Sequence, residues 1–133
     1  MNAEQTEIAE SCLRGAESNS MSFPEIVGKL MQAGFESYAI DFRRATATYY
    51  LTDGESIIFP THRLEAPIAP ALDINAVRAA IGEAQRSAPG YTYLGFCAKV
   101  MAGGCAGYVV SFSGRRAVYF GRTAETHVEH FPQ

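Results

Sequence analysis

Hydrophobic residues recur along this chain with two different periods, and each period occurs twice. Apolar side chains three and four residues apart mark residues 3–17 and 74–87, which is typical of one face of an amphipathic helix. Shorter stretches with the same spacing begin at Ser22 and Thr92, which are good N-cap residues. They end before Gly34 and Gly104, where a left-handed residue commonly closes a helix. The pattern predicts four helices.

Each short helix is followed by strict alternation of apolar and polar residues, which predicts a β-strand. A return strand follows in both places, after Arg43-Arg44 and after Ser113-Gly114, where we expect tight two-residue turns. This loop length would place aromatic residues opposite one another across the two hairpins. The expected pairs are Tyr38 with Tyr49 and Tyr108 with Tyr119.

The two series of elements lie 70 residues apart, which predicts an internal duplication. Residues 22–50 align with residues 92–120 without a gap. The matched positions also have matched roles as caps, apolar stripe and strand residues. Seven aligned pairs are identical: Lys29/Lys99, Met31/Met101, Gly34/Gly104, Tyr38/Tyr108, Phe42/Phe112, Ala47/Ala117 and Tyr49/Tyr119.

Prolines separate the two series. Asp53-Gly54 signals a hairpin, and residues 55–59 are expected to add a strand before Pro60, Pro67 and Pro70 interrupt regular structure. We therefore predict one α+β domain, residues 1–133, with an antiparallel sheet of four or five strands and helices packed on one face. Its two similar helix–helix–strand–strand halves are expected at 1–59 and 73–122, joined by a linker at 60–72.

Composition narrows the functional classes. The 133 residues carry a net charge of −3 and are 47% hydrophobic, without a clustered basic patch, so nucleic-acid binding is not expected. No stretch of about 20 apolar residues predicts a membrane span, and the start of the chain lacks a secretory signal pattern. We expect a cytoplasmic protein that contains reduced thiols at Cys12, Cys97 and Cys105.

The three cysteines fall where packing is expected. Cys12 lies on the apolar stripe of the first helix, while Cys97 and Cys105 align with Val27 and Phe35 of the other half. Structural thiols are therefore favoured over a nucleophile. The chain also lacks phosphate-loop and nucleophile-elbow motifs, and no cofactor is predicted.

The end of the chain holds the strongest local candidates for chemistry. On a strand, Glu125, His127 and Glu129 would share one face, whereas on a helix His127 and His130 would be neighbours. Either arrangement could supply a general base or metal ligands, with metal candidates His127, His130 and Glu125. The catalytic candidates are His127, Glu125, Arg122 and Tyr119. The alternative is a capping box, since Thr126 and Glu129 have the spacing of one.

The face of the sheet opposite the helices is a second candidate site. Tyr50, Val118 and Phe120 are expected to point there. An exposed apolar strip at this place would indicate a partner or dimer surface. We therefore expect a homodimer through this face.

Several stretches of the chain resemble one small bacterial and prophage-borne family of unknown function that is often labelled "phage envelope protein". The resemblance spans nearly the whole chain, and its most distinctive part is the ending. It implies a phage-related or structural role and supplies no catalytic residues. The stretches are Phe23-Pro24-Glu25-Ile26-Val27, Thr48-Tyr49-Tyr50, Gly104-Cys105-Ala106-Gly107-Tyr108 and the run from Gly121 to Pro132.

Two functional interpretations stay open at this point. A non-enzymatic binding or interaction module is favoured, because the sequence holds no nucleophile–base pair, phosphate loop or firm metal motif. The alternative is a small enzyme, with or without an assisting metal, whose site lies around the histidines and glutamates at the end of the chain.

Overall fold

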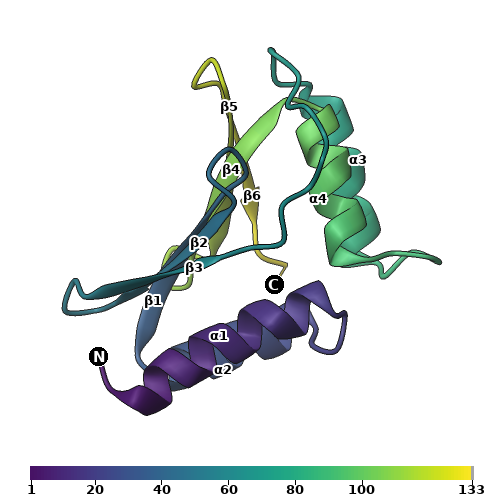
Figure 1. Cartoon of the computed structure of the whole chain (residues 1–133). Coiled ribbons are helices and arrows are strands. Elements are labelled where there is room, and N and C mark those ends of the chain that lie inside the picture. The colour runs from purple at the N-terminus through teal and green to yellow at the C-terminus, as the bar shows by residue number, and fades with distance from the viewer. Residues whose placement is uncertain (133) are drawn as a thin grey trace.

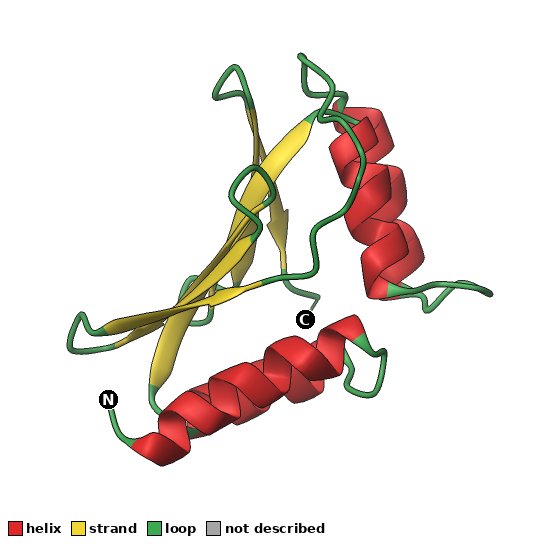
Figure 2. Ribbon diagram, viewed as in Figure 1, coloured by secondary structure: helices red, strands yellow, loops and turns green. Residues whose placement is uncertain are grey.

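The computed structural model describes residues 1–132, which form four α-helices and six β-strands (Figures 1 and 2). The helices are α1 (Ala3–Glu17), α2 (Phe23–Gln32), α3 (Ile74–Gln85) and α4 (Tyr93–Ala102). The strands are β1 (Phe35–Asp41), β2 (Thr46–Leu51), β3 (Ser56–Pro60), β4 (Cys105–Ser111), β5 (Arg116–Gly121) and β6 (Thr126–His130). The α+β class and the four helices are confirmed.

The strands form one antiparallel sheet in the order β3-β2-β1-β4-β5-β6. The expectation of four or five strands is wrong, because β6 extends the sheet beyond residue 122. A tight turn makes this sixth strand possible: the Gly121 amide donates to the Glu125 carbonyl at 2.8 Å, and Ala124 adopts a φ of 66°. The second helix–helix–strand–strand series therefore gains a third strand, as the first has in β3.

Polar side chains cap the N-termini of the two short helices, as the sequence predicts. Ser22 and Glu25 form a reciprocal capping box at α2, and Thr92 accepts a hydrogen bond from the Gly95 amide at α4. These bonds use backbone N–H groups that would otherwise lack a partner at a helix start. Both short helices thus begin where the sequence predicts.

The two hairpins have the expected register but longer loops. Tyr38 pairs with Tyr49, and Tyr108 pairs with Tyr119. The predicted two-residue turns are wrong, because four residues lie between the paired strands at 42–45 and 112–115. Ala45 adopts a φ of 54° to close the first loop. Adding one residue on each side of a two-residue turn preserves the pairing, so the register prediction survives.

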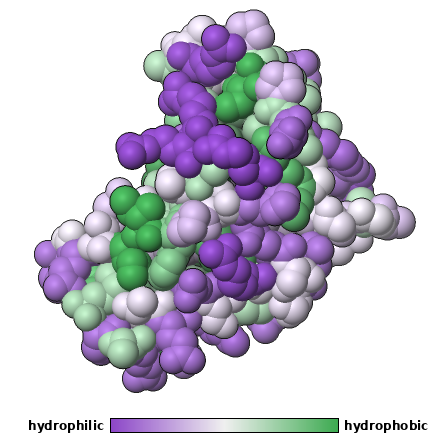
Figure 3. Space-filling model, viewed as in Figure 1, coloured by the Kyte–Doolittle hydropathy of each residue, from purple (hydrophilic) through white to green (hydrophobic). Residues whose placement is uncertain are grey.

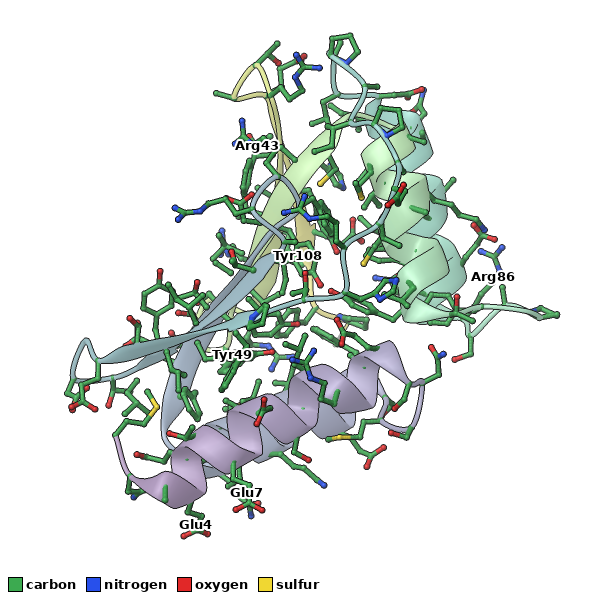
Figure 4. All side chains as sticks on the ribbon, in the orientation of Figure 1. Glu4, Glu7, Arg43, Tyr49, Arg86 and Tyr108 are labelled. Atoms are coloured by element: carbon green, nitrogen blue, oxygen red, sulfur yellow. The ribbon has the colours of Figure 1, made fainter. Side chains whose placement is uncertain are left out.

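Both helical pairs pack on one face of the sheet, and their side chains share a hydrophobic core with it (Figures 1 and 2). Figure 4 shows Tyr49 and Tyr108 between the sheet and the helices, whereas Glu4, Glu7 and Arg86 lie on the outer side of the helices. The fully buried side chains with the largest volumes come from both halves: Leu30, Val77, Val100, Val110, Cys12 and Cys105.

The linker between the halves packs against the sheet and α4 rather than lying free on the surface. Leu72 is buried, and the Asp73 amide donates to the Gly103 carbonyl at 2.7 Å. A Cβ atom on Gly104 would lie 2.0 Å from the Ala71 carbonyl oxygen, so the linker backbone touches this glycine directly. The linker is therefore part of the packed structure.

The spacing of 70 residues recurs in the bounds of the elements. Helices α2 and α4 differ by this number at both ends, and so do the strand pairs β1/β4, β2/β5 and β3/β6. Each of β1 and β4 also carries an irregularity at its second residue, Glu36 and Ala106. The internal duplication itself stays a prediction.

Candidate functional site

The face of the sheet away from the helices carries a row of uncharged residues that is apolar at every position except Thr48. Its six residues are neighbours in register, one from each strand, and none of them is charged. From β3 to β6 the row reads Ile58, Thr48, Ala39, Val109, Val118 and Val128. We call this row, together with Tyr50 and Phe120 beside it, the open face.

Several side chains of the open face are accessible to solvent. Ile58 is 61% exposed, and Val109, Val128 and Tyr50 are each close to 40% exposed. Phe120 is more covered, because its ring lies over Gly107 on the neighbouring strand. Figure 3 shows one side of the molecule, where hydrophobic surface interrupts the hydrophilic surface in separate patches.

Two charged residues of opposite sign border the apolar row. In the rows of residues directly beside it, Asp41 comes from β1 and Arg116 from β5. Their formal charges cancel, so the face has no net charge that would repel a second copy. Nor does it offer the cationic surface that phosphate contacts require.

The polar residues of β6 are divided between the two faces of the sheet. His127 and Glu129 point toward the helices, and the His127 Nε2 atom lies 3.0 Å from a Glu129 carboxylate oxygen. Gln85 at the end of α3 donates to the other carboxylate oxygen at 3.4 Å, and the Tyr119 ring lies beside the His127 ring. His130 alternates with His127 and Glu129 and lies at the opposite, exposed face.

The other candidates from the end of the chain take part in the turn before β6. Glu125 accepts hydrogen bonds from the Thr123 hydroxyl at 2.6 Å and the Leu72 amide at 3.4 Å, and these bonds lower the pKa of the Glu125 carboxyl. Arg122 donates to the Ile68 carbonyl at 3.2 Å. Both side chains therefore fasten the linker to the turn.

The sequence left open whether the end of the chain is a strand or a helix, and the structure shows a strand. Residues 126–130 are a strand, so neither the helical His127–His130 neighbours nor a capping box of Thr126 and Glu129 exists. Within residues 1–132, no group of three His, Cys, Asp or Glu side chains is placed to hold a metal ion. Of the candidate residues, the structure brings together His127 and Tyr119, with Glu129 beside them.

The His127–Glu129 pair occupies positions that are apolar in the other half. The residues 70 positions earlier are Ile57 and Phe59, and Phe59 is buried against Tyr49. This difference between the halves was available from the sequence, because the spacing of 70 applied to the strand predicted at 55–59 also locates β6.

The cysteines lie in the core, as the aligned positions predict. All three thiols are free and buried, and burial raises the pKa of Cys97 to about 12 and that of Cys105 to about 11. A thiol held in its neutral form is a poor nucleophile. Packing is therefore the role that their surroundings support.

A buried hydroxyl pair beside Cys97 was not predicted from the sequence. The Tyr93 and Tyr108 hydroxyl oxygens lie 2.6 Å apart. Burial raises the pKa of both tyrosines well above the usual value. Tyr93 and Cys97 line a small pocket together with Thr61 and His62. The pair was missed because Tyr93 aligns with a phenylalanine, Phe23, which has no hydroxyl.

None of the helices in the described chain is long and apolar enough to cross a bilayer. The comparison with curated proteins finds no match. The chain matches one family model, described as "Protein of unknown function (DUF1398)", over residues 11–129. The model's description contains no phage envelope label, so that part of the resemblance stays a prediction. Because the match covers nearly all of its 133 residues, the chain belongs to the DUF1398 family of proteins of unknown function.

Proposed function

We propose that this protein is a non-enzymatic interaction module, built by internal duplication, that forms a homodimer through its open face. The observation that carries the proposal is the uncharged row across all six strands, which is apolar on every strand except β2, where Thr48 stands. Exposed apolar surface of this continuity is costly in water and is commonly covered by a partner.

The size of the open face fits a modest sheet-on-sheet interface. Six strands about 4.8 Å apart and about five residues long outline roughly 400 Å² for this whole side of the sheet, with the open face at its centre. Side-chain relief adds to this outline, so full overlap approaches about 600 Å² per partner, the lower end for specific interfaces. We expect two such sheets to stack about 10 Å apart, as in β-sandwiches.

Sedimentation velocity over a range of concentrations tests this proposal. We expect the wild-type protein to approach twice its monomer mass of 14.4 kDa as concentration rises. Val109→Glu places a charge at the centre of the open face and is expected to shift the equilibrium to monomer by at least tenfold in Kd. Because Val109 is 39% exposed in the single chain, the variant is expected to fold.

Met31→Glu is the matched control, because Met31 is an exposed apolar residue on α2 and lies outside the open face. This variant is expected to dimerise like the wild type. A wild-type protein that stays monomeric at all concentrations would overturn the dimer, and so would a Val109→Glu protein that dimerises normally.

A small enzyme is the second candidate, favoured by one observation. The contact between the His127 ring and the Glu129 carboxylate is the arrangement that orients a general base. Elemental analysis of the purified protein and the stability of His127→Ala test this alternative together. If the purified protein holds no metal and His127→Ala only lowers its stability, the enzyme hypothesis loses its candidate site.

A further inference from the structure

The outer edge of β6 carries backbone groups that point away from the sheet. Bonded and non-bonded positions alternate along an antiparallel pair of strands. The Gly121 amide donates to the Glu125 carbonyl and the Phe131 amide donates to the Arg115 carbonyl, so the odd-numbered residues of this segment bond to β5. The N–H and C=O groups of the even-numbered residues therefore face outward. These residues are Thr126, Val128 and His130.

The opposite edge of the sheet, at β3, is protected against pairing. The same alternation places Ser56, Ile58 and Pro60 on its outer side. Pro60 has no N–H, and its carbonyl already accepts a hydrogen bond from Arg14 at 3.1 Å. Prolines and bonded carbonyls at an edge prevent another strand from adding to it. Strand β6 contains no proline, and no other strand of residues 1–132 lies on its outer side.

The sequence of β6 matches itself when a second copy runs antiparallel to it. With Val128 facing Val128 across a two-fold axis, Thr126 faces His130, so every outward-facing residue of the strand has a partner. Each of these pairs would exchange two backbone hydrogen bonds. Val128 would also continue the row of the open face into the second copy.

His127 and Glu129 select this register by charge. In the register centred on Val128, His127 of one copy lies directly opposite Glu129 of the other, where Cα atoms approach to about 4.5 Å. The neighbouring registers place His127 opposite His127 or Glu129 opposite Glu129, and like charges that face each other across strands destabilise a pairing. The two side chains are 16% and 30% exposed, so a second copy can reach both.

We propose that the outer edge of β6 binds a second copy of this chain, by antiparallel pairing of the two β6 strands centred on Val128. The pair extends the sheet from six strands to twelve. This surface goes beyond the stacking of open faces and does not depend on it, because it uses the backbone edge rather than side chains of the sheet face. The edge is short, so we expect pairing at higher protein concentration than stacking.

Amide hydrogen exchange followed by NMR tests this proposal in the Val109→Glu variant, whose open face is blocked. The protein concentration is varied up to the millimolar range. We expect the Thr126, Val128 and His130 amides to exchange at least threefold more slowly at the highest concentration than at the lowest. The Ile58 amide on β3 should keep its rate, and sedimentation equilibrium of the same samples gives the Kd.

Val128→Pro in the same background removes the central outward-facing N–H and no bond to β5. It should abolish the dependence of exchange at Thr126 and His130 on concentration. Ile58→Pro is the matched control, because it is the same substitution 70 residues earlier, at the outer side of β3. This variant should pair as its parent does. The amide spectrum of each variant shows independently whether it folds.

The charges are tested by reversal and exchange. His127→Glu places carboxylates opposite one another and should raise the Kd at least tenfold, whereas His127→Glu/Glu129→His should return it to the parent value. Exchange rates that do not depend on concentration overturn the proposal, and so does slowing that survives Val128→Pro. Equal Kd values for the reversed and exchanged variants overturn the register. A protein that pairs through β6 but never stacks keeps this proposal and contradicts only the open-face dimer.

Discussion

Gly104 shows how a single residue joins the linker to the sheet. It has a φ of 91°, a conformation that side chains disfavour, and the linker backbone lies against it. Gly34, its counterpart, has a φ of 100°, but an added Cβ would meet only ordinary contacts there, the nearest at 3.5 Å. Both glycines therefore need a positive φ, but only Gly104 is in close contact with the backbone of the linker.

This difference predicts unequal costs for the same substitution. Gly34→Ala should lower the free energy of unfolding by about 1–2 kcal/mol, the cost of a left-handed alanine. Gly104→Ala should cost at least about 3 kcal/mol, because the linker must also move. Urea unfolding of both variants measures the two values. Equal losses would contradict direct packing of the linker on Gly104.

Cys97 gives a prediction for alkaline pH. Burial raises its pKa in the folded protein from the ordinary value of 9.0 to about 12. The unfolded thiol therefore loses its proton first as pH rises, so the contribution of this group to stability is present below pH 9 and is lost between pH 9 and 12. The loss approaches about 1.4 kcal/mol per pH unit.

Cys97→Val tests this titration with little change in packing, since Val27 occupies the aligned position. We expect the variant to lose stability less steeply than the wild type between pH 9 and 12, measured by urea unfolding at each pH. Because both proteins keep the buried tyrosines, the difference between their slopes reports Cys97 together with its influence on the tyrosines around it. Identical slopes would show that the thiol does not titrate as its burial requires.

At the scale of elements, the hydrophobic pattern of the sequence predicted the helices and strands that bury one face in the core. Helices and paired strands were found because their apolar positions are periodic, and the register followed from the place of each turn, which set Tyr38 opposite Tyr49. Strand β6 was missed because His127 and Glu129 stand where β3 has apolar residues, which hides the alternation. These polar residues also made the end of the chain resemble a functional site. Only the structure shows that His127 and His130 lie on opposite faces of the sheet.

Replacing the polar pair of β6 with the residues of β3 tests what the pair contributes. The double variant His127→Ile/Glu129→Phe should raise the free energy of unfolding by about 1–2 kcal/mol, because apolar burial replaces a partly buried polar contact. His130→Ile, on the exposed face of the same strand, is the control and should change stability little. Loss of stability in the double variant would show that the His127–Glu129 contact supports the fold.

At the scale of the whole molecule, strands β1 and β4 join the two halves at the centre of the sheet. Ala39 pairs with Val109, its own counterpart 70 residues later, and the pairing is symmetric about this position. Burial is shared in the same way, because the core cluster contains residues of both halves. The sequence predicted the halves from their matching patterns, but not the pairing of β1 with β4, since no pattern specifies which strands of separate hairpins meet.

This shared centre predicts that neither half folds alone and that the two restore the fold together. Cutting the chain after Glu65, in the linker, gives fragments 1–65 and 66–133. Each should show little helix by circular dichroism when isolated at low concentration. Without the other half, the apolar residues of its part of the core are exposed to water. Mixed at equal concentration, they should recover the spectrum of the intact protein and sediment as a one-to-one complex.

A proline at an even-numbered position of β1 provides the control, because these residues bond to β4, as the Phe42 amide does to the Ala106 carbonyl at 2.9 Å. Ile40→Pro in the first fragment should abolish recovery, whereas Thr61→Pro, beyond the end of β3, should weaken it less. A fragment that is monomeric and fully folded by itself would contradict a core shared across β1 and β4. The symmetric register also gives fragment 1–65 a way to pair with itself at high concentration, with Ala39 facing Ala39, so sedimentation must accompany the spectra.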